Sequence, residues 1–472
     1  PTPDKELVTD GHVSHTIGNL DNHVTNWGLI GSRPSVPTPF SLAPSARWRG
    51  VDYLWASGVW FGGVVLGEPL VTTGQYQNEF MASEAPGDTI FGTYRGAPGG
   101  NRYPWSGADD DGDGTEDEDP HDGLDNDNDG LVDEDFAAAS DQSFRSVMGD
   151  DHQLIQDIYP DHTPMDLEIV QETYQWASPI GEDFIGYEYR VRNIGNQVIE
   201  GFHCGIFSDF DILEPSNDMA ASWNRSGTGL VRNSWGAFVP VFIGWMYDGA
   251  SSGAAPGLVG FVMCGVETDA AAGPPANTLA MHSYQIFSGN LPFENGGDPT
   301  NDAERYELLQ LDQWDADTLP GRESDYRTLM STEAVPVLAP GETVNFRFAM
   351  VIADNLDDLL VLAANAVTIA QGQCFDRDGD PANGAEFCVP WLHPDEVPVP
   401  AVTGRLQAHP GPGSVALAFD VRAELGARAE VERRATEGVP LRAWSLDQGS
   451  GRVVDDDAVG WPRTYDLKLK SS

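Results

Sequence analysis

The chain has 472 residues, which is enough for about two to four domains of ordinary size. Its 74 acidic residues outnumber the 26 basic ones, and the net charge of −48 repels polyanions, which excludes nucleic acid as a partner. The sequence contains no apolar run of the roughly 18 to 20 residues that a transmembrane helix needs. The 52 glycines, 33 prolines and 10% aromatic residues favour many short strands, so we expect a mainly β protein.

Residues 1–30 are polar and extended in character, with Val13, His15 and Ile17 alternating as in a weak strand. The sequence opens at Pro1 with no initiator methionine and no signal peptide, which is typical of a processed, exported chain.

Residues 31–392 carry aromatic and β-branched runs at regular intervals, from VDYLWASGVWFGG near the start to TVNFRFAMVIA near the end. This spacing predicts a β-sandwich of the immunoglobulin or jelly-roll kind, interrupted by an acidic insertion at 109–135. Residues 357–369 have acids at the start and glycine just after the end, which predicts one short helix.

Three prolines within residues 393–402 predict an extended linker, because proline removes backbone donors and fixes the chain. Residues 403–472 alternate apolar and polar positions as a fibronectin type III-like sandwich does. The run RTYDLKL reads as the sixth strand of such a domain. We therefore expect a C-terminal domain that lacks its last strand and presents an open sheet edge.

The most specific motif is an acidic double repeat, DDDGDGTEDED followed by DNDNDGLVDED, with 15 carboxylates and no lysine or arginine between positions 109 and 135. Calcium takes six to eight oxygen ligands, and carboxylates at alternate positions of a loop turned by glycine converge on one ion. Gly114 and Gly130 make these turns. The spacing predicts two calcium ions, whose ligands are Asp109, Asp111, Asp113, Asp117 and the Thr115 carbonyl, and Asp125, Asp127, Asp129, Asp133 and the Leu131 carbonyl.

Two further oxygen-rich segments are weaker candidates for calcium. One is CFDRDGDPANGAEFC, in which the candidate ligands are Asp376, Asp378, Asp380 and Glu386. The other is SDFDILEPSND, in which they are Asp209, Asp211, Asn217 and Asp218. For the second segment a plain loop with Asx turns is the competing interpretation.

The four cysteines suit an oxidising compartment. Cys374 and Cys388 bracket a short polar loop that a disulfide would close, with a stabilisation of about 3 kcal/mol. Cys204 and Cys264 lie in apolar, strand-like runs. They either pair across a sheet or remain buried thiols.

Signals for catalysis are poor. The ten histidines show no H-E-x-x-H spacing, and the G-x-S-x-G letters at 249–253 lack the flanking strand and helix of a nucleophile elbow. Carboxylates are so abundant that an acid pair discriminates nothing. We therefore expect a protein that is not an enzyme.

The acidic loops lack EF-hand helices and a twelfth-position glutamate, and they resemble the calcium loops of thrombospondin type 3 and dockerin-like repeats. Beyond them, NHVTNWGLIGS (22–32), VWFGG (59–63) and STEAVPVLAPGETVNFRFAMVIADNLDDLLVLAANA (331–366) resemble a group of large secreted bacterial surface proteins. That resemblance implies export and calcium loops, without an assigned activity.

These features predict an extracellular, calcium-stabilised structural protein that self-associates into a homopolymer. In this hypothesis residues 1–18 add a strand to another subunit, along the run 463–469. The alternative is that both ends pack on their own subunit. An adhesin or carbohydrate-binding surface protein is the second functional interpretation, to which 13 tryptophans give slight support, and a secreted hydrolase is the third.

Overall fold

The computed structural model describes the chain in separate stretches. They are residues 12–31, 44–75, 77–82, 90–94, 140–224, 229–249, 255–268, 281–289, 291–375, 387–397, and the strands between 402 and 470 as backbone. Contacts divide the chain into a larger unit, 1–229 with 240–396, and a smaller one, 230–239 with 397–472. The division at 396/397 lies inside the predicted linker.

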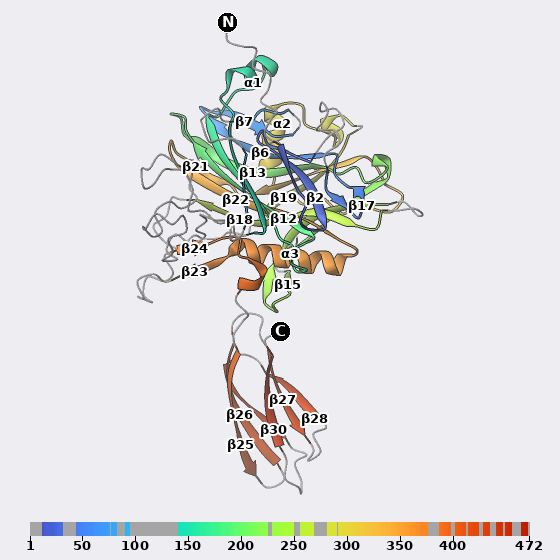
Figure 1. The fold of residues 1–472 in the computed structure, drawn as a ribbon, viewed down its shortest axis with the longest axis vertical. Helices are drawn as coiled ribbons and strands as arrows, with labels where there is room; N and C mark the ends of the chain where they lie inside the picture. The colour runs from blue at the N-terminus through green and yellow to red at the C-terminus, as the bar shows by residue number, and fades with distance from the viewer. Residues whose placement is uncertain are drawn as a thin grey trace. The chain divides into compact units, whose positions relative to one another are not determined.

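The larger unit is built on two antiparallel sheets (Figure 1). The bounds of the strands in the first sheet are His12–His15 (β1), Leu20–Thr25 (β2), Leu29–Ile30 (β3), Arg47–Trp48 (β4), Val51–Asp52 (β5), Ala56–Val65 (β6), Glu68–Thr73 (β7), Ile199–Asp209 (β13), Met281–Ser288 (β19), Tyr326–Thr332 (β20) and Val335–Leu338 (β21). The order is β19-β20-β13-β6-β3-β2-β4-β5, and β1, β7 and β21 pair with β2, β6 and β13.

The second sheet has the order β14-β17-β18-β22-β12-β11-β10-β8, and β9 pairs with β10. The bounds of its strands are Met81–Ala82 (β8), Phe91–Thr93 (β9), Gln142–Gly149 (β10), Leu167–Gln175 (β11), Phe184–Asn193 (β12), Asp218–Trp223 (β14), Phe242–Asp248 (β17), Leu258–Thr268 (β18) and Thr343–Ala353 (β22). The predicted β-sandwich is thus confirmed.

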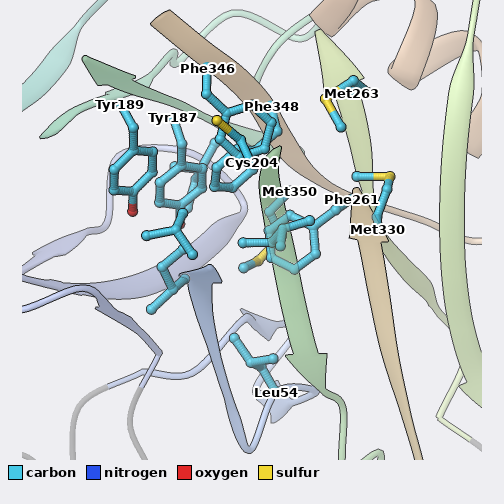
Figure 2. Close-up of a cluster of buried hydrophobic side chains, with 14 of the residues drawn as sticks. Leu54, Tyr187, Tyr189, Cys204, Phe261, Met263, Met330, Phe346, Phe348 and Met350 are labelled. Carbon is cyan, nitrogen blue, oxygen red and sulfur yellow. The ribbon is translucent and has the colours of Figure 1, made fainter. Parts of the chain in front are cut away.

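The core lies between the two sheets and is rich in aromatic rings (Figure 2). Tyr187 and Tyr189 on β12 are fully buried and stack on Phe348 of β22 at ring-centroid distances of 5.1 and 5.7 Å. Phe261 from β18 meets the same phenylalanine ring edge-on at 5.5 Å. Buried aromatic rings contribute much of the stabilisation of such a core, so these contacts hold the two sheets together.

Helices cover the outer faces of the sandwich. The predicted helix is confirmed as α3, Leu356–Gln371, which begins at the Asn355 N-cap, ends at Gly372 and packs on β22 and β18. Helix α2, Asp302–Gln310, packs on the opposite face against β7 and β20 (Figure 1). Short helical turns occupy Gln153–Ile158 (α1), Pro215–Asn217 (η2), Phe293–Asn295 (η3) and Pro394–Glu396 (η4). The sequence analysis missed α2, although Asn301 caps it by accepting from the Glu304 amide, a recognisable start signal.

The N-terminal segment is part of the first sheet. Strand β1 pairs with β2 of the same chain over His12–Thr25 to His15–Asn22, and His15 is fully buried. The prediction that residues 1–18 are donated to another subunit is therefore wrong for 12–15. Residues 1–11 lie outside the described residues.

The smaller unit contains two three-stranded sheets among its described residues, β25-β26-β29 and β28-β27-β30. The bounds of these strands are Val402–Gly411 (β25), Ser414–Ala423 (β26), Arg428–Arg434 (β27), Pro440–Leu446 (β28), Gly449–Asp455 (β29) and Thr464–Lys470 (β30). The run RTYDLKL forms β30, which pairs with β27 and is an edge strand within the described backbone. The first stretch of this unit, 230–239, holds a hairpin of Leu230–Arg232 (β15) and Phe238–Pro240 (β16), whose last residue is assigned to the larger unit.

Candidate metal centre

A group of aspartates gathers where the chain passes from the first sheet to the second. Strand β13 of the first sheet ends at Asp209, and β14 of the second sheet begins at Asp218. The neighbouring strand β20 follows directly after Asp325, and its register places Arg327 opposite Asp209. A bridge between Asp218 and Ser324 joins the two sheets at the same point. We call the residues Asp209, Asp211, Asn217, Asp218, Asp298 and Asp325 the seam cluster.

Three carboxylates of the seam cluster share one small space. Oxygens of Asp209, Asp211 and Asp325 all lie within 4.8 Å of one another. Asp209 is 5% exposed, while the other two are half-buried. Carboxylate oxygens at this spacing suit a hard divalent cation such as calcium, which takes oxygen ligands at 2.3–2.6 Å.

Arg327 compensates only part of the negative charge. Its Nε lies 3.2 Å from Asp209 Oδ2, and its Nη1 lies 3.4 Å from Asp325 Oδ1 and 3.8 Å from Asp298 Oδ2. One guanidinium therefore faces three carboxylates, in addition to Asp211 at the edge of the group. The excess of negative charge favours binding of a further cation.

Several oxygens of the seam cluster are buried without a hydrogen-bond partner among the described residues. They are the Oδ1 atoms of Asp209, Asn217, Asp218 and Asp298, and that of Asp325, which has only the 3.4 Å ion pair with Arg327. A buried acceptor that makes no hydrogen bond costs about 1–3 kcal/mol, and a charged one costs more. These oxygens are the ligand atoms that an oxygen-binding cation uses.

The pKa values of three of these aspartates are raised, which shows that their charged forms are unfavourable at the seam. Burial, reinforced by the neighbouring Asp211, Asp325 and Asp298, raises the pKa of Asp209 to about 7 against the opposing effect of Arg327. Burial and Asp325 raise the pKa of Asp211 to about 6. Burial and neighbouring aspartates raise the pKa of Asp218 to about 9. At neutral pH these raised pKa values favour protonation of Asp218 and partial protonation of Asp209 in the ion-free protein.

The structure brings together part of the predicted site. Asp209 and Asp211 of the SDFDILEPSND segment lie close together with Asp325, whereas Asn217 ends the turn η2 and Asp218 begins β14. The Asx-turn alternative does not account for this cluster, because the carboxylates meet residues from distant segments. Sequence reasoning missed Asp298 and Asp325, which have no repeated spacing around them.

The other predicted ligands lie outside the described residues. These are Asp109, Asp111, Asp113, Thr115, Asp117, Asp125, Asp127, Asp129, Leu131 and Asp133 of the double repeat, and Asp376, Asp378, Asp380 and Glu386. The two calcium ions at the double repeat and the weaker site at 376–386 therefore stay predictions.

Two of the cysteines are free thiols. Cys204 on β13 and Cys264 on β18 are each 1% exposed, and burial raises the pKa of both thiols far above its usual range. The suggested disulfide between them is therefore wrong, and the buried-thiol alternative holds. Cys374 and Cys388 stand directly opposite each other in the hairpin of Gln373–Phe375 (β23) and Phe387–Val389 (β24). Their disulfide stays a prediction that this register permits.

Comparison with known proteins adds little. No family model and no curated protein matches the chain. Among solved structures, the chain has a TM-score of 0.24 to a polysaccharide lyase, at 10% identity over 65% of this chain and 33% of that one. It has TM-scores of 0.30 to an Aspergillus nidulans amine oxidase (9% identity, 73% and 52% covered) and 0.25 to a copper-containing benzylamine oxidase from Hansenula polymorpha (6%, 74% and 61%). The chain thus spans less than two thirds of those proteins. No helix among the described residues is long and apolar enough to cross a membrane.

Proposed function

We propose that this chain is a calcium-binding structural protein of the bacterial cell exterior, in which bound cations stabilise the fold and no reaction is catalysed. The observation that supports this best is the position of the seam cluster. Asp209 ends a strand of the first sheet, Asp325 directly precedes another strand of that sheet, Asp211 lies on the connection to the second sheet, and Asp218 begins a strand of the second sheet. A cation held by Asp209, Asp211 and Asp325 would fix two strand ends of the first sheet next to the point where the chain enters the second.

A structural role also suits the charge of the chain. With a net charge of −48, folding brings carboxylates closer together and divalent cations lower the resulting repulsion. A ligand that binds only the folded state stabilises it by about 2.7 kcal/mol when its concentration is 100 times its Kd. Calcium at the seam, and at the predicted 109–135 loops, would therefore set how stable the protein is.

Thermal unfolding in millimolar calcium and in excess chelator tests this proposal. We expect the melting temperature to rise with calcium, and to rise less in an Asp325→Asn variant, which loses one anionic ligand. Asp161→Asn serves as the matched control, because it removes an equal charge from an exposed turn before β11. Equal calcium-dependent shifts in wild type and Asp325→Asn would exclude an ion at the seam.

The assembly part of the proposal is that subunits self-associate into a filament by strand addition. Strand β30 supports it, because an edge strand offers unpaired backbone groups to another strand. Negative-stain electron microscopy in calcium and in chelator tests it directly. Filaments that vanish in chelator favour a calcium-stabilised homopolymer, whereas discrete particles under both conditions contradict assembly.

The other two candidate functions have different support. A glycan-binding surface is expected to expose several flat aromatic rings. Among the described residues the most exposed aromatic side chain is Tyr94, at 52%, so this candidate has little support. A secreted hydrolase is favoured by one observation: Asp209 has a pKa of about 7 beside Asp211 and Asp325, as a general acid needs. Hydrolysis of polysaccharide substrates that Asp209→Asn abolishes would establish the enzyme and replace the structural proposal.

A further inference from the structure

A buried acid–base pair links the connection between β10 and β11 to the loop that follows β7. The chain leaves β10 at Gly149 and enters β11 at Leu167. We call residues 151–166, which include α1, the strap. His162 of the strap faces Glu79 of the β7 loop, with Nδ1 of the imidazole 3.5 Å from Oε1 of the carboxylate. The two side chains are 0% and 1% exposed, so water does not screen their interaction.

The contacts of the pair show where a proton is needed. Oε2 of Glu79 accepts from the backbone amide and the hydroxyl of Thr73, at 2.7 and 2.9 Å. Nε2 of His162 lies 3.1 Å from the backbone carbonyl oxygen of Asp150, which can only accept, so Nε2 carries a hydrogen. The other nitrogen, Nδ1, faces a carboxylate oxygen, which in its charged form also only accepts. A proton between Nδ1 and Oε1 is therefore required, because two buried acceptors would otherwise face each other.

The charged groups around the imidazole favour this proton. Burial alone lowers the pKa of His162, but Glu79 and Asp150 together outweigh burial and raise it above the ordinary value of 6.5. From α2, Asp302 adds negative charge near Glu79 and is itself paired with Arg305 at 3.0 Å. Burial raises the pKa of Asp150 to about 6 against the hydrogen bonds that its carboxylate accepts. Asp150 therefore changes charge at a lower pH than His162 does.

The pair fastens the strap where the strap forms part of a pocket. Asp151 and His152 at the start of the strap line a pocket of about 260 Å³ together with Met81 and Ala82 of β8. Strand β8 begins shortly after Glu79, so the pair connects two of the segments that line the pocket. Release of the strap would therefore change the shape of this pocket.

We propose that His162 and Glu79 form a proton-dependent clasp, which holds the strap on the β7 loop while a proton lies between them and releases it as pH rises. The clasp is independent of the proposed metal site, because neither residue belongs to the seam cluster. Since the folded pKa of His162 lies above the unfolded one, the stabilisation is complete below about 6.5 and is lost as pH rises through the folded pKa. Between the two values, the population of the open strap increases by up to about tenfold per pH unit.

Hydrogen–deuterium exchange of the full chain at pH 6.5 and pH 9 tests the clasp, with rates corrected for the intrinsic effect of pH and with calcium held constant. We expect wild-type peptides from the strap to lose protection at pH 9, while peptides from β22 keep it. Glu79→Gln should keep equal protection of the strap at both pH values, because its amide accepts from Thr73 and donates to the neutral imidazole. Asp161→Asn, which removes an exposed charge beside His162, should behave as the wild type does.

Two results would overturn the clasp. One is equal protection of the wild-type strap at both pH values, which would show that no proton holds it. The other is a Glu79→Gln strap that loses protection at pH 9 as the wild type does, which would place the cause outside this pair. His162→Gln can still donate to the Asp150 carbonyl but cannot be charged, so its strap should be poorly protected at both pH values. Melting curves at pH 6.5 identify a variant that does not fold, and the comparison of wild type with Glu79→Gln remains decisive if His162→Gln is one.

Discussion

Replacing Asp209 by asparagine should have opposite consequences in the absence and presence of calcium. In the ion-free protein the carboxylate is 5% exposed and lies among other acids, so removal of its charge relieves an unfavourable burial. In the ion-bound protein the same carboxylate is a ligand, so its removal weakens the site. A purely structural aspartate, paired with Arg327 and nothing else, would show no such dependence on calcium.

The expected magnitude follows from the pKa of Asp209, which burial raises from 3.8 to about 7. Each pH unit corresponds to about 1.4 kcal/mol, so ionisation in the folded, ion-free protein at pH 8 costs on the order of 4 kcal/mol. This cost already includes the attraction of Arg327, because that attraction lowers the pKa of Asp209 from the value that burial alone would give. We expect the ion-free variant to be more stable than wild type at pH 8, by at most about 4 kcal/mol.

The dependence on pH has a defined sign. Because the folded pKa lies above the unfolded one, the wild type loses this part of its stability as pH rises from about 4 to about 7. The advantage of asparagine should therefore be small at pH 4 and complete at pH 8. With calcium at 100 times its Kd, the wild type gains about 2.7 kcal/mol from this ion and the variant gains much less.

Scanning calorimetry of both proteins in chelator and in calcium, at pH 4 and pH 8, measures these differences. Ions at other sites contribute equally to both proteins and cancel in the comparison. Two results would refute the reasoning: an ion-free variant that is less stable than wild type at pH 8, or equal stabilisation of both proteins by calcium. Asp161→Asn again controls for the loss of one surface charge.

Three further predictions concern the fold. Leu66 is 81% exposed with φ of 53° before Gly67, so Leu66→Asn should match the preferred two-residue hairpin turn and add about 0.5–1 kcal/mol in urea unfolding. Arg347 lies 3.0 Å from Glu188 and 3.1 Å from Glu267, and Arg347→Met should cost about 3–5 kcal/mol in the same assay, because the buried Glu188 and the half-buried Glu267 each lose an ion pair. Cys204 and Cys264 should resist a maleimide reagent in the native protein and react once urea unfolds it, whereas labelling of the native protein would contradict their burial.

Local sequence signals located most of the sheet and one of the helices. The run around Tyr187 and Tyr189 predicts a strand because its residues alternate with the period of the pleat, and the structure makes it β12, which is buried on both faces along most of its length. Helix α3 has an amide cap, acids in its first turn and a glycine after its end. Helix α2 was missed because its apolar stripe is weak, although its N-cap is recognisable. Contacts with β7 and β20 stabilise this helix instead.

The candidate site could be predicted only in part, for a reason that lies in strand register. Asp209, Asp211, Asn217 and Asp218 are close in sequence, so the segment itself drew attention to them. Asp325 joins them because β20 pairs with β13 in the register that sets Arg327 opposite Asp209. Such a register is fixed by packing of whole strands and leaves no local pattern around Asp325. The pairing of Asp218 with Asp248 is hidden from the sequence for the same reason.

The core between the sheets is stabilised by packing, whereas the seam is rich in aspartates. This difference is the reason that we propose a cation as the ligand of the seam. Between the sheets, rings such as Phe348 and Tyr187 fill the space by stacking, which leaves packing to stabilise the interior (Figure 2). At the seam, the connection between the sheets leaves backbone amides such as that of Ile212 in need of acceptors, and Asp218 supplies one. Each aspartate that serves a strand end in this way adds negative charge beside the others. The proposed divalent cation would reconcile the two demands, because it would neutralise the carboxylates while they keep their positions at the strand ends.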